Sequence, residues 1–129
     1  IMVAGAIGGF LGGHLAAAGA VVTLVGRPRF GALLAENGMT LQRLNAAPQR
    51  LPLSDTLRYT TDPAALADCE VVLVCVQGTD TDAVGAILSG VLPAAALVVS
   101  FQNGLENPAR LRALTSRPSP ARVTTFTCW

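Results

Sequence analysis

Residues 3–13 read VAGAIGGFLGG, and this glycine-rich stretch decides the fold. It follows a short apolar run and precedes the β-branched run VVTLV at Val21–Val25. The pattern predicts a strand over Ile1–Ala4, a glycine turn, a helix over about Ile7–Ala18 that stops at Gly19, and a second strand over VVTLV. These elements make one βαβ unit.

A membrane helix is the alternative for the same stretch, because residues 1–26 carry no charge apart from His14, to which we assign no role. Glycine pairs with the GxxxG spacing of membrane helix dimers also occur there, at Gly5/Gly9, Gly8/Gly12 and Gly9/Gly13. Against a membrane span stand seven glycines in 26 residues, the lack of a preceding basic segment, and the lack of Trp or Tyr at either margin. We therefore expect no membrane segment.

The composition indicates one α/β domain without a nucleic-acid partner. The 129 residues fit a single domain, and 51% hydrophobic against 13% charged residues suits helices packed on a sheet. Nine basic and eight acidic residues are scattered along the chain, and all nine basic residues are arginines, which excludes lysine chemistry from it. Cys69, Cys75 and Cys128 lack metal-ligand spacing, so we expect free thiols in a reducing cytoplasm and no metal site.

The rest of the chain alternates between helix and strand patterns. Strands are predicted over residues 39–44, 57–61, 70–76, 96–101 and 122–129, and helices over 30–38, 79–92 and 106–115. The first two of these strands are expected in a small antiparallel excursion or at a sheet edge. Residues 70–76 are expected to form a central parallel strand, after a capped helical turn with Pro63 at its first position. The order predicts a Rossmann-like, doubly wound, mainly parallel sheet with helices on both faces, in one domain over residues 1–129.

The glycine loop matches a dinucleotide-binding loop only in part. In such a loop the second glycine lets the backbone approach a pyrophosphate and the third lets the helix lie close to the strand, and Gly5 and Gly8 match these two. The first glycine is replaced by Val3, whose branched side chain resists a turn with positive φ. Unpaired N–H groups of Ala6 to Gly9 at the helix N-terminus still favour phosphate. Close helix–strand packing without a ligand is the alternative.

Polar residues that follow the predicted strands over residues 21–25 and 96–101 indicate which cofactor the chain binds. An NAD-specific protein places Asp or Glu after the second strand, whereas this chain has Arg27, 19 residues beyond Gly8. Arginine there fits a 2′-phosphate and implies NADP(H); a solvated loop residue is the alternative, and Arg29 is a second candidate. Gln102 and Asn103 follow a buried strand at the edge where ligands bind, and we expect them to contact ribose, nicotinamide or substrate. A simple turn before a helix is the alternative for Asn103.

Four segments together resemble the N-terminal domain of the ketopantoate reductase (2-dehydropantoate 2-reductase) family. They are GAIGGFLGGHLAAAGA, VTLVGRPR, VVLVCVQGTDTDAV and VVSFQNGLENPARL, and they agree in order and spacing from residue 1 to about residue 114. The resemblance implies reduction of 2-dehydropantoate to pantoate with NADPH, on the route to pantothenate. It also implies a helical C-terminal substrate domain, which we expect to be absent from this chain.

The resemblance assigns roles residue by residue. It places Arg27 on the 2′-phosphate and Asn103 in the nicotinamide and substrate pocket. It places the pyrophosphate on Gly5, Ala6, Ile7 and Gly8. Gln77, also expected near the cofactor, stands where the family usually carries a lysine, and typical members have a Gly-Ala pair that is missing around Val3. The general-acid lysine of the family belongs to its C-terminal domain, so we expect the chain alone to be inactive, with the loss of acid catalysis costing ~10²–10⁴ in rate.

The expected partners are a small 2-oxo acid and, in the full-length protein, a second copy in a homodimer. Two other interpretations stay open. One is a non-catalytic Rossmann-like binding module or remnant. The other is the domain of a different NADP-dependent hydroxyacid dehydrogenase.

Overall fold

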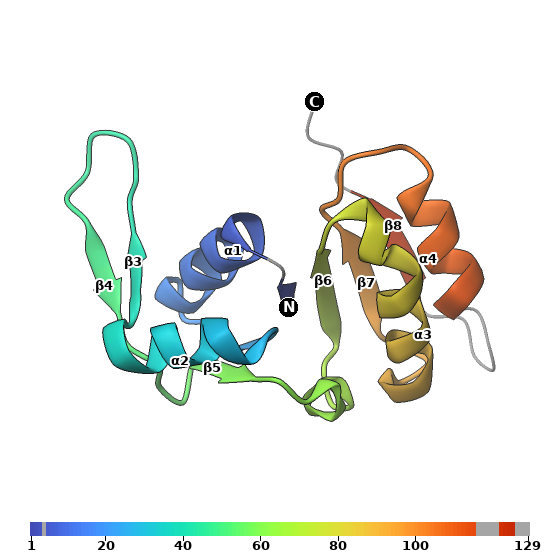
Figure 1. Ribbon diagram of the computed structural model, residues 1–129, viewed down its shortest axis with the longest axis horizontal. Helices are drawn as coiled ribbons and strands as arrows, with labels where there is room; N and C mark the ends of the chain where they lie inside the picture. The colour runs from blue at the N-terminus through green and yellow to red at the C-terminus, as the bar shows by residue number, and fades with distance from the viewer. Residues whose placement is uncertain (4, 116–121, 126–129) are drawn as a thin grey trace.

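A computed structural model describes residues 1–3, 5–115 and 122–125 (Figure 1). Strands and helices alternate along most of the chain, as predicted. The strands are β1 (Met2–Val3), β2 (Val22–Val25), β3 (Met39–Leu41), β4 (Gln49–Leu51), β5 (Leu57–Thr60), β6 (Val71–Cys75), β7 (Leu97–Ser100) and β8 (Arg122–Thr125). The helices are α1 (Ala6–Ala17), α2 (Pro28–Asn37), α3 (Thr81–Val91) and α4 (Asn107–Thr115), with 3₁₀ turns η1 (Pro63–Leu66) and η2 (Gly78–Asp80). Ala4 and residues 126–129, which include Cys128 and fall in predicted strands, lie outside the described residues.

Six strands form one parallel sheet in the order β5–β2–β1–β6–β7–β8. From β1 the chain first builds outward through β2 to β5, then returns past β1 and builds the other way through β6, β7 and β8. The direction of winding therefore reverses between β1 and β6. This order confirms the predicted doubly wound, Rossmann-like α/β fold.

Alternating residues of β6 face two separate cores. Val72 and Val74 pack with α3 and α4 in one hydrophobic cluster, whereas Leu73 and Cys75 belong to a second cluster on the side of α1. Because successive side chains of a strand point to opposite faces, the helices cover both faces of the sheet. Figure 1 shows the same division, with α1 and α2 on one side of the strands and α3 and α4 on the other. Residues 71–75 are central and mostly buried, as predicted.

Helix α1 packs on the sheet through glycines. Its buried residues are Gly8, Gly9, Gly12 and Gly13, and a Cβ at Gly12 would lie 2.6 Å from the Cδ2 of Leu24. The glycine face lets the helix axis come close to β2, and it leaves the large apolar side chains of α1 on the outside. Ile7 and Phe10 are accordingly 52% and 51% exposed.

Two expected strands have partners that the sequence did not indicate. β3 pairs antiparallel with β4, a strand that was not predicted, and the two form a separate small sheet. β5 instead joins the main sheet as its edge strand, parallel to β2. The alternatives of an antiparallel excursion and a sheet edge are thus both present, in different strands.

The remaining elements follow the sequence closely. The carboxylate of Asp62 accepts a hydrogen bond of 2.9 Å from the N–H of Ala64, which caps the turn that begins at Pro63. Cys69 and Cys75 are free thiols. In the described part of the chain, no helix is long and apolar enough to cross a bilayer.

Candidate functional site

The winding reversal between β1 and β6 opens a crevice at the carboxyl ends of the strands. Doubly wound sheets bind ligands there, because the loops that leave the two strands diverge to opposite faces. The loop after β1 leads into α1 and the loop after β6 leads through η2 into α3. The loops that carry most of the predicted site residues therefore lie at one edge of the sheet.

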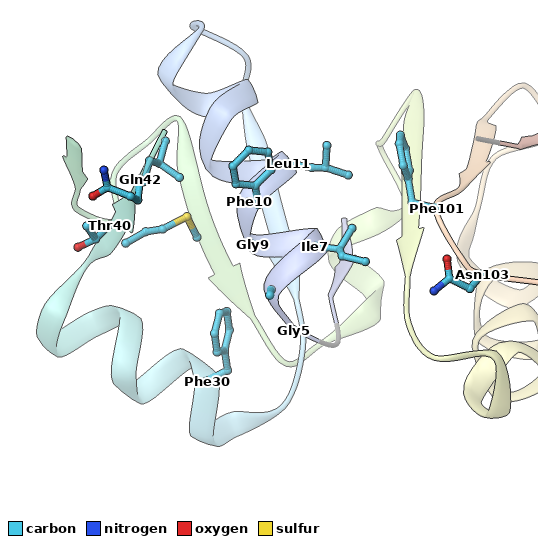
Figure 2. A pocket seen from close by; sticks show the side chains of 13 residues that line it. Gly5, Ile7, Gly9, Phe10, Leu11, Phe30, Thr40, Gln42, Phe101 and Asn103 are labelled. Atoms are coloured by element: carbon cyan, nitrogen blue, oxygen red, sulfur yellow. The ribbon is translucent and has the colours of Figure 1, made fainter. Parts of the chain in front are cut away.

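A pocket of about 800 Å³ lies at this edge and wraps around the first half of α1 (Figure 2). Ile7 and Leu11 point from α1 toward Phe101, whereas Phe10 lies on the side of the β3–β4 hairpin. The wall is mainly apolar, with polar groups from Thr40, Gln42 and Asn103. Its residues are Gly5, Ala6, Ile7, Gly9, Phe10, Leu11, Phe30, Met39, Thr40, Leu41, Gln42, Phe101 and Asn103.

The N-terminus of α1 supplies the anion-binding groups of this pocket. Gly5 is the N-cap residue, and its extended backbone has no side chain that caps the helix. The N–H groups of Ala6, Ile7 and Gly8 have no acceptor within the helix. The expectation of a fourth free N–H is wrong, because the N–H of Gly9 donates to the carbonyl oxygen of Gly5 at 3.1 Å. Three N–H groups and the positive end of the helix dipole remain for an anion.

Gly5 faces open space. A Cβ at this position would have no described atom within 4 Å, unlike the glycines that pack against the sheet. The first turn of α1 also has no acidic residue that would repel an anion. The loop has room for a phosphate group to approach the backbone, although Val3 replaces the first glycine of the usual pattern.

Arg27 lies at the end of β2, and its side chain reaches toward the far side of the crevice. The side chain is 85% exposed, and its guanidinium lies 3.8 Å from the carboxylate of Asp80 in the turn after β6. The backbone of Arg27 is held by the hydroxyl of Tyr59, which donates to its carbonyl oxygen at 2.6 Å. Arg27 is not among the described residues that line the pocket, but its exposed side chain extends from a backbone that Tyr59 holds in place.

Two amide residues follow β7 and have different surroundings. Asn103 is exposed and lines the pocket. Gln102 is 4% exposed, and its amide nitrogen donates to the hydroxyl of Thr81 at 2.8 Å and to the carbonyl oxygen of Val76 at 3.3 Å. We expected the Gln102 side chain to contact a ligand, but the protein itself uses its hydrogen-bonding groups, so we assign it a structural role.

The other predicted residues lie outside the described wall of the pocket. Gly8 is buried in α1. Gln77 is exposed and is the N-cap residue of η2. His14 lies farther along α1, and the guanidinium of Arg43 is 3.0 Å from its Nδ1. The structure therefore brings Gly5, Ala6, Ile7 and Asn103 together and leaves Arg27 and Gln77 at the surface nearby.

Sequence reasoning missed most of the apolar wall. Ile7, Phe10 and Leu11 have the i, i+3, i+4 spacing of a helix face, which normally indicates the buried face. The glycines of α1 take that place, so the apolar stripe faces the pocket. The sequence did contain a signal for this arrangement. Gly8, Gly9, Gly12 and Gly13 form a stripe of small residues along the same helix, and such a stripe marks the side that packs closely.

None of the described residues that line the pocket has an ionisable side chain. Burial raises the pKa of the Cys75 thiol to about 11, so this thiol below the loop is neutral at physiological pH. Hydrogen bonds from Arg110 lower the pKa of Asp82, at the start of α3. Among the described residues, no group of three or more His, Cys, Asp or Glu side chains could hold a metal ion. The arrangement offers backbone donors, the amides of Gln42 and Asn103 and the nearby guanidinium of Arg27, which are suited to binding and orienting a ligand.

Comparison with known proteins gives a consistent family. A family model described as ketopantoate reductase PanE/ApbA matches residues 1–129. A 2-dehydropantoate 2-reductase from Halobacterium salinarum is 34% identical over 113 residues, which are 83% of this chain and 34% of the relative. The chain thus spans about a third of the length of this curated relative.

Solved structures resemble the fold closely. The crystal structure of a PanE/ApbA family ketopantoate reductase from Ralstonia eutropha has a TM-score of 0.80 and 31% identity, over 94% of this chain and 38% of that one. A putative ketopantoate reductase from Ralstonia solanacearum has a TM-score of 0.66 and 33% identity, over 78% of this chain and 30% of that one. A 2-dehydropantoate 2-reductase from Geobacter metallireducens, at 24% identity, shares the fold with a TM-score of 0.80 over 99% of this chain and 41% of its own.

Proposed function

The chain belongs to the ketopantoate reductase family, and from this premise we propose that residues 1–129 are one NADP(H)-binding domain. The observation that carries the proposal is the composition of the pocket. Residues 5–7, which follow β1, and Asn103, which follows β7, line one pocket beside the point where the winding of the sheet reverses. Dinucleotides bind across this crevice in doubly wound sheets.

The groups present fit such a cofactor. The pyrophosphate would bind the free N–H groups of Ala6, Ile7 and Gly8, next to the open space at Gly5. Arg27 would bind the 2′-phosphate, because its exposed guanidinium has only the Asp80 carboxylate as a described partner, at 3.8 Å. Asn103 would orient the nicotinamide or the substrate. When bound, the reduced nicotinamide supplies a hydride.

For the whole protein we propose the reduction of a small 2-oxo acid, 2-dehydropantoate, to its hydroxy acid. The proposal follows the names of the relatives, of which this chain spans only part. This chain has no lysine to act as the general acid, so we expect it to bind cofactor without catalysing the reaction. The free thiols of Cys69 and Cys75 support a cytoplasmic location, and a homodimer of the full-length protein stays part of the proposal.

Isothermal titration of the 129-residue chain with NADPH tests the proposal. We expect one site per chain and weaker binding of NADH, because NADH lacks the phosphate that Arg27 would bind. No heat of binding at millimolar NADPH would refute it.

Two neighbouring arginines give a matched pair of variants. R27A should weaken NADPH binding about 10-fold, the worth of a hydrogen bond between charged groups, and should leave NADH binding unchanged. R29A removes the same charge at the second candidate, which lies two residues along the chain in α2. We expect it to change neither affinity much, and a loss of NADPH binding in R29A but not in R27A would assign the 2′-phosphate to Arg29 instead. An equal loss in both variants would mean that general electrostatic attraction, and not a 2′-phosphate site, holds NADPH.

A non-catalytic binding module is the second candidate, and the exposed apolar face of α1 favours it. Ile7, Phe10 and Leu15 are 52%, 51% and 41% exposed, and such side chains suit a protein contact. Inserting Gly-Ala between Ala4 and Gly5, which gives the run GAGAIGG, and changing Gln77 to lysine would restore the family pattern. NADPH binding by this variant alone, with none by the original chain, would support the second candidate.

A further inference from the structure

A chain of buried hydrogen bonds joins the two loops at the edge of the crevice. Thr81, Gln102 and Asn107 are 0%, 4% and 6% exposed. Gln102 donates to the hydroxyl of Thr81 at 2.8 Å, and that hydroxyl donates to the Oδ1 of Asn107 at 3.1 Å. Asn107 in turn donates through Nδ2 to the carbonyl oxygen of Asn103 at 2.6 Å. This series of hydrogen bonds therefore connects Gln102, just after β7, to the backbone of Asn103, which lines the pocket.

The network fixes the orientation of the Asn107 amide. Its Oδ1 accepts from Thr81 and also from Arg110, at 3.3 Å, so Nδ2 must face Asn103. The amide is also tightly enclosed, since a Cβ at Gly78 or Gly104 would lie 3.1 or 3.3 Å from Nδ2. A buried amide held on both sides has one available position.

The segment from Asn103 to Glu106 has no regular secondary structure to hold it in place. Gly104 has a φ of 101°, in the left-handed region that glycine enters freely, and residues 103–106 form no helix or strand. The Asn107 bond to the Asn103 carbonyl is the described contact that holds this bend to the start of α4. Without it, the exposed Asn103 side chain would move with its backbone.

We propose that Asn107, held by Thr81, is a positioning residue that fixes Asn103 for contact with the nicotinamide end of the cofactor. The inference rests on the proposed function and adds to it an explanation of how the exposed amide of Asn103 is held in its orientation. The network spans the loops after β6 and β7, so it also fixes the two sides of the crevice relative to each other. Asn107 itself does not line the described pocket.

Two ligands separate positioning from a general effect on folding. NADPH bound as proposed would extend from the glycine loop to Asn103, whereas 2′-phospho-ADP-ribose has the same phosphates and lacks the nicotinamide. T81V keeps the shape of residue 81 and removes its hydroxyl, while Gln102 keeps Val76 and Asn107 keeps Arg110 as partners. We expect T81V and N107D to weaken NADPH binding roughly 3- to 10-fold, about the worth of one hydrogen bond, and to leave 2′-phospho-ADP-ribose binding unchanged.

Three further variants complete the test. T81S restores the hydroxyl and should bind both ligands like the wild type. T115V removes another buried hydroxyl, which bonds to Leu111 in α4, and should change neither affinity. In an N103A background, T81V should have no further effect on NADPH binding, because the positioned group is gone.

The outcomes distinguish this inference from the function on which it rests. A wild-type chain that binds neither ligand overturns the proposed function and the inference with it. A wild-type chain that binds both, together with T81V losses that are equal for the two ligands or zero for both, overturns only the positioning role. If T81V weakens NADPH binding by the same factor in the N103A background as in the wild type, the positioning role is also overturned.

Discussion

Replacing Gly5 with alanine is expected to remove most of the affinity for NADP(H) while leaving the fold in place. A Cβ at Gly5 would meet no described atom within 4 Å, so the protein itself has room for the methyl group. The methyl group would instead occupy the space through which a phosphate reaches the N–H groups of Ala6 and Ile7. Hydrogen bonds to charged groups contribute about 1.5–3 kcal/mol each, so losing one or two corresponds to about 3 kcal/mol, or roughly 100-fold in Kd.

The assay combines thermal unfolding with titration. G5A should lower the free energy of unfolding by at most about 1 kcal/mol, because alanine is a poorer N-cap residue than glycine. G90A is the matched control: Gly90 lies in α3, is exposed and also has nothing within 4 Å. It should bind NADPH like the wild type and gain up to about 1 kcal/mol in stability from helix propensity. A G5A chain that binds NADPH with the wild-type Kd would refute the assignment of the loop as the phosphate site.

Two further predictions concern packing and thiol reactivity. G85A should destabilise the chain by about 1–2 kcal/mol in urea unfolding, because overpacking outweighs the gain in helix propensity. Its Cβ would lie 2.6 and 2.9 Å from the Cδ1 and Cβ of Leu114, and an unchanged midpoint would show that α3 and α4 separate easily. Iodoacetamide at pH 8, followed by mass spectrometry, should label Cys75 at least about 100-fold more slowly than an ordinary exposed thiol. The rise of its pKa from 9.0 to about 11 depletes the thiolate, and labelling as fast as that of the half-buried Cys69 would contradict the burial of Cys75.

The sequence predicted the elements better than their partners. Helix α1, strand β6 and the capped turn at Pro63 have local signals in glycine spacing, a continuous apolar run and capping residues. β4 has only three residues between Pro48 and Pro52, which is too short for a pattern to appear. The place of β5 beside β2 depends on long-range pairing, which no local pattern carries.

The same limit applies to the site. Gly5 and Asn103 were predicted because their positions at strand ends are visible in the sequence. The burial of Gln102 was not, since it depends on Thr81, 21 residues earlier in the chain. The apolar wall was missed for a different reason: in α1 the small residues form the packing face and the large ones face outward, which inverts the usual pattern.

The two halves of the sheet meet at β1. Among the described residues, β1 shares one register pair with β2 and two with β6, whereas β2–β5, β6–β7 and β7–β8 share four each. Both hydrophobic clusters extend across β1, because Met2 and Val25 pack with α3 and α4 on one face of the sheet, and Cys75 packs with residues of β2 on the other. Side-chain packing on both faces therefore reinforces the backbone pairing of β1. A ligand held at once by the start of α1 and by the loop after β7 would add a further link between the two halves of the sheet, and its binding would raise the free energy required to separate them.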